Sequence, residues 1–231
     1  MSYAFEPIGI VHSPFREKFG IPRQPGLAPG AKARLELLAP FDRPEALDGL
    51  EGFSHIWLTF VFHQALGTRW RPRVRPPRLG GNRRVGVFAS RSPFRPNPIG
   101  LSAVALEGVS GSGGKIELLL SGVDLLDGTP VLDIKPYVPY ADSIPDARGG
   151  FAAGPPEACM RVRFSERAQR QLACRDDADG LERLIVDLLA VDPRPAYADD
   201  GRPDRVYGMR LYDFDLKWRV RGDTIEVLEL C

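Results

Sequence analysis

The sequence predicts a mainly β protein, with a β-barrel or β-sandwich over residues 1–150 and a small α+β domain over residues 151–231. The first part contains about seven short β-branched or aromatic runs, joined by irregular connections. The chain has 22 prolines and 24 glycines, which indicates many turns. After residue 156, apolar residues recur at helical spacing before strand-like alternation returns.

The first part is expected to consist almost entirely of strands. Residues 5–11 (FEPIGIV) and the alternating residues 31–38 form strands, and residues 45–50 form a short helix. Residues 53–62 (FSHIWLTFVF) are almost continuously apolar, which is typical of a central strand and places His55 in the core. Further strands are expected at residues 85–89, 101–108, 116–126 and 130–134, with a flexible turn at 109–114 and a hairpin turn at Asp127-Gly128.

The second part follows a turn-rich stretch at residues 135–156. Ser165 followed by Glu166 is typical of a helix N-terminus, so a helix is expected over residues 165–172. Residues 179–190 carry leucine and isoleucine at helical spacing and form a second helix. Residues 206–211, 214–220 and 224–230 alternate as three strands.

Composition excludes several classes of protein. No apolar stretch reaches the roughly 18 residues of a membrane span, and the N-terminus lacks the regions of a signal peptide. The three cysteines, Cys159, Cys174 and Cys231, have no C-x-x-C spacing, and the three histidines are scattered. These patterns argue against a disulfide framework and against a metal site, so we expect a cytoplasmic protein without a metal.

The arginines are concentrated in one segment without acids. Between Gly52 and Leu106 there is no Asp or Glu, while nine arginines lie there: Arg69, Arg71, Arg73, Arg75, Arg78, Arg83, Arg84, Arg91 and Arg95. Because the whole chain has a net charge of only +1, the remainder is acidic. A charge block of this size indicates a polyanionic partner, with nucleic acid first. The alternative is that these arginines pair with acids elsewhere in the fold.

A stiff loop lies inside this basic segment, at residues 80–101 (GGNRRVGVFASRSPFRPNPIGL). Prolines at positions 93, 96 and 98 fix three φ angles and remove three backbone donors, which excludes a helix or a central strand after residue 90. Arg91, Arg95 and Asn97 project from the loop with donors suited to an anionic or planar ligand. The alternative is an arginine-decorated surface loop that binds nothing.

Familiar catalytic signatures are absent, including G-x-S-x-G, H-E-x-x-H, the P-loop and the Rossmann G-x-G-x-x-G. His63 and Gln64 follow the apolar run, where a binding role and a structural role are both open. Asp124 and Asp133 are expected to face a pocket, where either could orient a ribose hydroxyl or an amine.

Long, ordered motifs nevertheless resemble one family. They are IGIVHSPFREKFGIPRQPG, LEGFSHIWLTFVFHQ, RPPRLGGNRRVGVFASRSPFRPNPIGLS, SGVDLLDGTPVLDIKPYVPYADS and DPRPAY. Together they make the chain similar to the TsaA-like family. The resemblance implies a β-barrel methyltransferase that uses S-adenosyl-L-methionine without a Rossmann fold, carries an α+β C-terminal domain and forms a homodimer. It also implies that the substrate is tRNA, methylated on N6 of the threonylcarbamoyladenosine 3′ of the anticodon in threonine tRNA.

The resemblance also assigns roles to residues. The family's cofactor pocket corresponds to Arg23, Gln24, Pro25, His63, Gln64, Arg91, Leu101, Ser121, Gly122, Val123 and Asp124. Asp124, or a water that it holds, is the hypothesised catalytic group that takes a proton from the acceptor nitrogen. Contacts with the anticodon loop are expected from Arg73, Arg75, Arg78, Arg83, Arg84, Arg95, Asn97, Tyr137 and Arg194. Two alternatives remain: a non-catalytic RNA-binding β-barrel, and a small-molecule enzyme whose basic segment serves dimerisation.

Overall fold

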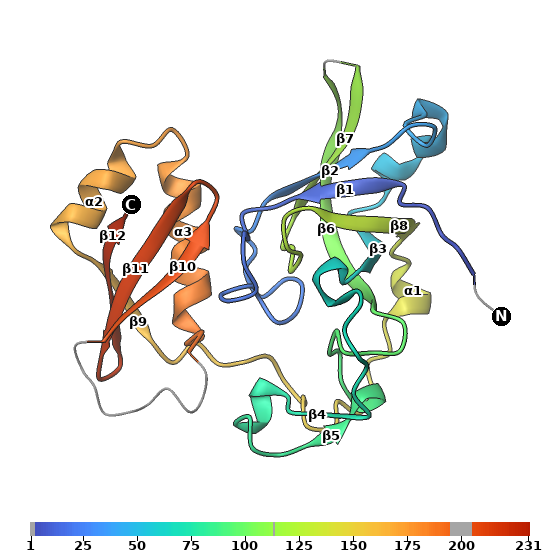
Figure 1. The fold of residues 1–231 in the computed structure, drawn as a ribbon. Helices are drawn as coiled ribbons and strands as arrows, with labels where there is room; N and C mark the ends of the chain where they lie inside the picture. The colour runs from blue at the N-terminus through green and yellow to red at the C-terminus, as the bar shows by residue number, and fades with distance from the viewer. Residues whose placement is uncertain (1–2, 113, 195–204) are drawn as a thin grey trace.

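Six antiparallel strands in the N-terminal part close into a barrel (Figure 1). They are β1 (Gly9–His12), β2 (Ala33–Leu37), β3 (His55–Val61), β6 (Ile99–Ser112), β7 (Lys115–Ser121) and β8 (Thr129–Pro136). Each strand pairs with two neighbours in the order β1-β2-β7-β6-β3-β8, and β8 returns to β1. The structure, a computed structural model, describes residues 3–112, 114–194 and 205–231. The prediction of a mainly β protein is confirmed.

Alternation along the strands builds the barrel core. On β3, Ile56, Leu58 and Phe60 are buried, while the residues between them are half-buried. Each such buried side chain stabilises the fold by roughly 1.5–3 kcal/mol, so a one-residue slip of register would be strongly unfavourable. His55 lies on the outward phase of this strand and is exposed, with Ser54 Oγ 2.9 Å from its Nδ1. The prediction that His55 is a core residue is therefore wrong.

The hairpin of β6 and β7 is longer than the sequence predicts and extends beyond the barrel (Figure 1). The predicted flexible turn at 109–114 is wrong for its first four residues, because Val109 to Ser112 continue β6. These four residues pair with Lys115 to Leu118 on β7. The partner strand satisfies their backbone groups and holds them extended, although their own side chains have little preference for a strand. The tight turn is reached only at Gly114, which has a φ of 77°.

The segment after β7 also differs from the prediction. The predicted strand 116–126 ends at Ser121, because Gly122 adopts a left-handed φ of 69°. Asp127-Gly128 is not a hairpin turn, since β7 and β8 are not neighbours in the barrel. Instead, Asp127 N donates to Phe15 O at 2.8 Å, and the Asp127 carboxylate accepts from Ser13 N at 3.0 Å. The turn residues therefore fasten the chain that follows β1.

Part of the basic segment forms an arm below the barrel (Figure 1). We call residues 69–86 the arginine arm; it contains β4 (Arg73–Val74), the 3₁₀ turn Pro77–Leu79 and β5 (Val85–Gly86). The predicted strand at 85–89 is correct only for its first two residues, because Val87–Ala89 form a 3₁₀ turn. The predicted helix at 45–50 is likewise two 3₁₀ turns, Pro44–Leu47 and Leu50–Gly52. The short helix α1 (Pro139–Asp142) follows the last barrel strand.

The C-terminal part is a four-stranded sheet with two helices packed on one face (Figure 1). Its elements are β9 (Arg161–Phe164), α2 (Glu166–Ala173), α3 (Ala178–Ala190), β10 (Val206–Leu211), β11 (Phe214–Arg221) and β12 (Thr224–Leu230). The predicted N-cap is confirmed, since Ser165 Oγ accepts a hydrogen bond from Ala168 N. Both predicted helices and all three predicted strands are present, and no described helix is long and apolar enough to cross a membrane.

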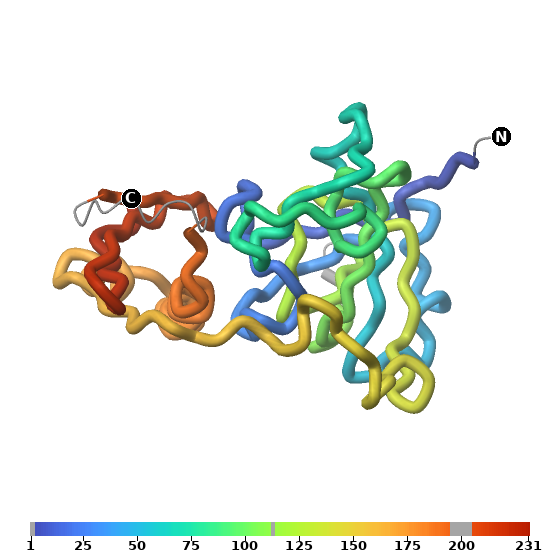
Figure 2. Tube along the Cα trace, turned by 90° about the horizontal axis from the view of Figure 1, so that it is seen from below, coloured from blue at the N-terminus to red at the C-terminus, as the bar shows by residue number. Residues whose placement is uncertain are grey.

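One loop contacts both the barrel and the C-terminal sheet. We call residues 13–30 the bridging loop; it lies between the two parts in both views (Figures 1 and 2). Phe15 forms an isolated antiparallel bridge with Leu211, and Arg210 N donates to Glu17 at 3.0 Å. The ring of Phe19 stacks on that of Trp218 with centroids 6.0 Å apart. One hydrophobic cluster consequently runs through both parts of the molecule.

Candidate active site

A cavity of about 720 Å³ lies where β3 ends, β6 begins and the bridging loop passes. Aromatic side chains form much of its wall, namely Trp57, Phe60, Phe62 and Phe94. Polar groups converge on it from four segments of the chain: Arg23 and Gln24, His63 and Gln64, Arg91, and Asp124. An aromatic hollow with a few convergent polar groups is typical of a small-molecule site.

Seven of the eleven predicted cofactor residues line this cavity: Arg23, Gln24, His63, Gln64, Arg91, Leu101 and Asp124. The other four, Pro25, Ser121, Gly122 and Val123, lie outside its lining. Gly122 O accepts a hydrogen bond from Gly26 N at 2.8 Å, and Val123 N donates to Ala31 O at 3.3 Å. The backbone of Gly122 and Val123 therefore fastens the end of the bridging loop to the chain that follows β7. This contact holds Arg23 and Gln24 in the cavity wall.

Asp124 is the acidic group of the cavity. Ser102, which is only 2% exposed, donates through Oγ to Asp124 Oδ1 at 2.7 Å. Burial raises the pKa of Asp124 to about 6, although the Ser102 hydrogen bond and the charge of Arg91 both act to lower it. A carboxyl group with this pKa can hold or release a proton near neutral pH, as an acid–base group must.

Two further side chains define the polar rim. Arg91 donates through Nη1 to Gln24 Oε1, which ties the proline-rich loop to the bridging loop. Burial, reinforced by the charge of Lys18, lowers the pKa of His63. His63 is therefore neutral at physiological pH, and one of its ring nitrogens remains an acceptor.

Sequence reasoning missed Phe60, Gly100 and Ser102, which all line the cavity. Gly100 and Ser102 on β6 lie opposite Phe60 and Leu58 on β3. A methyl group at Gly100 would lie 2.2 Å from the Phe60 ring, so only glycine lets that ring reach the cavity wall. All three residues stand in the quoted motifs, but their meeting at the cavity follows from the β3–β6 register, which local patterns do not reveal.

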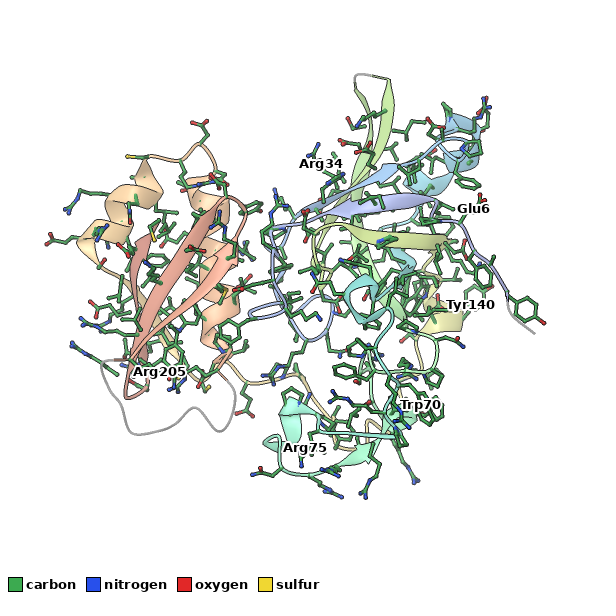
Figure 3. All side chains as sticks on the ribbon, in the orientation of Figure 1. Glu6, Arg34, Trp70, Arg75, Tyr140 and Arg205 are labelled. Atoms are coloured by element: carbon green, nitrogen blue, oxygen red, sulfur yellow. The ribbon has the colours of Figure 1, made fainter. Side chains whose placement is uncertain are left out.

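The nine arginines of the basic segment are mostly exposed, as Figure 3 illustrates for Arg75. Within the described ranges, no ion pair joins any of them to a carboxylate. The alternative that they pair with surplus acids therefore lacks support in this part of the chain. Four contact other groups instead: Arg71 lies 4.3 Å over the Phe94 ring, Arg78 donates to Gly154 O, Arg91 donates to Gln24 Oε1, and Arg95 donates to Ser90 O at 2.7 Å.

The remaining predicted RNA contacts have varied settings. Arg73, Arg75, Arg78, Arg83 and Arg84 lie in the arginine arm, and Asn97 is exposed beyond it. Tyr137 packs against Trp57, with ring centroids 5.6 Å apart. Arg194 is largely buried and forms a two-pronged ion pair with Asp192 at 2.8 Å, which raises its pKa.

The prediction that Asp133 faces a pocket is wrong. Its carboxylate pairs with Lys135 Nζ at 2.6 Å, and its side chain is 47% exposed. The difference follows from a register irregularity between β3 and β8. Asp133 pairs with Thr59 and Val131 with the next β3 residue, Phe60, so the alternation of β8 is broken between Val131 and Asp133. Among the residues that the structure describes, no group of three or more His, Cys, Asp or Glu side chains could hold a metal ion.

Two family models account for most of the chain. The tRNA-methyltransferase O N-terminal domain matches residues 10–143, and the TrmO C-terminal domain matches residues 157–231. The chain belongs to the tRNA-methyltransferase O family. It is 49% identical to the tRNA (adenine(37)-N6)-methyltransferase of Escherichia coli K12, over 99% of this chain and 98% of that protein.

Other relatives agree with this assignment to the TrmO family. RcsF of Pseudomonas aeruginosa, assigned by name to the S-adenosylmethionine-dependent methyltransferases, is 54% identical over the whole of this chain and 98% of its own length. The crystal structure of TrmO from Pseudomonas aeruginosa superposes with a TM-score of 0.82 at 49% identity, covering 100% of this chain and 99% of that one. The family resemblance predicted from the motifs is confirmed, and with it membership of an S-adenosylmethionine-dependent methyltransferase family.

Proposed function

We propose that this protein methylates tRNA at adenosine 37, on N6 of a threonylcarbamoyladenosine in threonine tRNA, with S-adenosyl-L-methionine as the methyl donor. The observation that carries the proposal is the cavity, which brings together an acid–base carboxyl group, Asp124, aromatic side chains and arginines that form no ion pair with a carboxylate among the described residues. The names of the relatives point to the same reaction at adenine 37.

The lining of the cavity fits the donor. Trp57, Phe60 and Phe62 offer apolar and aromatic surface for an adenine ring, and Arg91 offers a guanidinium for an amino-acid carboxylate. Asp124 would lie near the positive charge of the sulfonium, which favours the ionised carboxylate. When bound, S-adenosyl-L-methionine supplies a methyl group on a sulfonium sulfur. The S–CH3 bond breaks on transfer, and the neutral thioether is a good leaving group.

The residues of the chain have two tasks in the reaction. They must align donor and acceptor in line and exclude water, to which proximity contributes up to about 7–11 kcal/mol. The acceptor nitrogen is amide-like, so it must lose its proton as the new N–C bond forms. Asp124 takes this proton, directly or through a water, while Ser102 holds its Oδ1 atom. The cavity then releases a neutral N6-methylated base.

The arginine arm supports the choice of RNA as the substrate. Its exposed guanidinium groups can contact phosphates along the anticodon stem-loop. Single-stranded loop bases can be splayed outward and stacked on aromatic rings, and Phe94 and Tyr137 lie close to the cavity. We also propose a domain boundary near residue 150, a homodimer and a cytoplasmic location, supported by the composition shift, the family resemblance and the cysteine pattern respectively.

A tritiated-methyl transfer assay tests the proposal most directly. Threonine tRNA carrying the threonylcarbamoyl group should be labelled, and the same tRNA without that group should not. Calorimetry should show that S-adenosyl-L-methionine binds the protein without RNA. Donor binding without labelling of either tRNA would support the small-molecule enzyme, and RNA binding without donor binding would support the non-catalytic barrel.

A further inference from the structure

A second cavity, of about 680 Å³, lies between the barrel and the C-terminal part. The bridging loop, the arginine arm and α3 all contribute to its lining. The two cavities share one wall, formed by Lys18, Ile21, Pro22 and Arg23. A molecule in the second cavity would therefore lie directly beside whatever occupies the first.

Three cations from two distant segments line this interdomain cavity: Lys18 and Arg23 from the bridging loop, and Arg75 from the arm. No ion pair joins any of the three to a carboxylate among the described residues. Burial lowers the pKa of Arg23, and the charge of Asp192 only partly opposes this. Such a cluster would be stabilised by an anion, most of all one with the spread oxygens of a phosphate.

The rest of the lining is mainly apolar. Phe19, Leu188 and Val191 form part of the wall, together with several prolines. The lining holds two acids against its three cations. Of these acids, Asp192 is paired with Arg194 at 2.8 Å and also acts on Arg23. Asp187 has one carboxylate oxygen that is buried without a hydrogen-bond partner. The combination offers apolar surface to a flat ring and positive charge to a phosphate.

We propose that the interdomain cavity binds the nucleotide next to the methylated one in the RNA loop. The base would lie against Phe19 and Val191, and its phosphate against Lys18, Arg23 and Arg75. This rests on the proposed function, because the neighbouring position follows from the wall shared with the donor cavity. It gives the C-terminal part a direct role in placing the substrate.

Two variants test this site without altering the donor cavity. Val191→Trp fills the interdomain space from the end of α3, and Arg75→Ala removes a cation contributed by the arm. Neither residue lines the barrel cavity. Arg69→Ala is the matched control, since Arg69 is an exposed arginine of the same arm that lines neither cavity.

The measurement is the affinity of each variant for anticodon stem-loops in which one loop base at a time is replaced by an abasic site. The wild type should lose roughly tenfold in affinity when a base beside the acceptor is removed. Val191→Trp should bind the intact RNA roughly tenfold more weakly than the wild type does. Its affinity should not fall further when the base beside the acceptor is removed from the RNA. Arg75→Ala should weaken intact and abasic RNA alike, and Arg69→Ala should weaken binding less than Arg75→Ala does.

Donor calorimetry and circular dichroism accompany these measurements. Donor affinity and helix content should be unchanged in Val191→Trp and Arg75→Ala. The proposal is overturned if Val191→Trp binds intact RNA as tightly as the wild type does. It is also overturned if the variant binds every abasic RNA as much more weakly than the wild type as it binds intact RNA, or if its affinity for the donor falls. Failure of methyl transfer by the wild type would instead contradict the proposed function, so the two failures are distinguishable.

Discussion

At the scale of single residues, Asp124 links burial to chemistry. Its folded-state pKa of about 6 lies above the ordinary value of 3.8, so ionisation costs the folded protein free energy. Below about pH 4 the carboxyl group is protonated in both states, and its burial costs no ionisation energy. As the pH rises from 4 to 6, the free energy of unfolding falls by about 3 kcal/mol in total. Such a carboxylate is retained at the expense of stability, which is typical of a functional group.

The first prediction concerns the pH dependence of methyl transfer. At low donor concentration, where the rate reports the free enzyme, the rate of the wild type should rise with pH through an apparent pKa near 6, because Asp124 must be ionised to accept a proton. Asp124→Asn should lose most of the single-turnover rate, and its remaining rate should no longer rise with pH near 6. The variant should also melt at a higher temperature than the wild type at pH 7. An Asn variant with an unchanged rate and pH profile at saturating donor would remove Asp124 from the mechanism.

The second prediction concerns Gly100. Gly100→Ala would place a methyl group 2.2 Å from Phe60, so the ring must move and the protein should lose roughly 1–3 kcal/mol of stability. Because Phe60 is part of the cavity wall, calorimetry should also show weaker donor binding. Gly108→Ala on the same strand is the control, since nothing lies within 4 Å of its added methyl group. Equal effects of the two variants would contradict the packing argument.

At the scale of elements, helices and strands could be predicted from the sequence where residues close together in the chain determine them. The cap at Ser165 and the leucine spacing of α3 identify both helices, and alternation identifies the strands of the C-terminal sheet. The extension of β6 through Val109–Ser112 could not be predicted, because small residues take their conformation from the partner strand. Asp127 was misassigned for the same reason, since its partners lie more than a hundred residues away in sequence.

The candidate site shows the same division. Arg91 and Asp124 were found because the family resemblance assigns roles to their positions in the motifs. Phe60 and Ser102 stand in the quoted motifs as well, but their place in the cavity wall follows only from the register of β3 against β6. Asp133 stands in a motif as well, but the register irregularity between β3 and β8 breaks the alternation before it, and it lies outside the cavity lining. Motifs therefore located the site, and the pairing of strands decided which side chains reach it.

The third prediction belongs to the arginine arm. Replacing both Arg83 and Arg84 with alanine should raise the apparent KM for tRNA, because these exposed groups are assigned to phosphates. The slope of log affinity against log salt should flatten by about 1.4–1.8 for two lost contacts. Arg34→Ala should leave the slope unchanged, because Arg34 pairs with Glu117 at 3.0 Å. An unaltered slope in the double variant would rule out phosphate contacts by this pair.

At the scale of the whole molecule, the bridging loop makes the two parts one folding unit. Its contacts with Leu211, Arg210 and Trp218 connect the barrel to the C-terminal sheet through backbone and aromatic groups. The continuous hydrophobic cluster has the same consequence. Unfolding of one part would expose apolar surface of the other, which favours a single cooperative transition.

The fourth prediction tests this coupling. Phe19→Ala should remove the stacking on Trp218 and cost about 1–2 kcal/mol. The barrel and the C-terminal part should still melt together, at a lower temperature, when followed by tryptophan fluorescence and by circular dichroism. Phe88→Ala, at a ring that is 74% exposed, should leave the melting temperature almost unchanged. Two separated transitions in the wild type would show that the bridging loop does not couple the parts.

The wall shared by the two cavities has a thermodynamic consequence. Lys18 and Arg23 face both spaces, so any ligand that shifts or orders them in one cavity changes the free energy of binding in the other. Such coupling is reciprocal: the factor by which the methyl donor alters RNA affinity equals the factor by which RNA alters donor affinity. The spent donor lacks the sulfonium charge and would couple through this wall differently. Release of the spent donor and of the RNA would thereby be coupled through the four residues that the two cavities share.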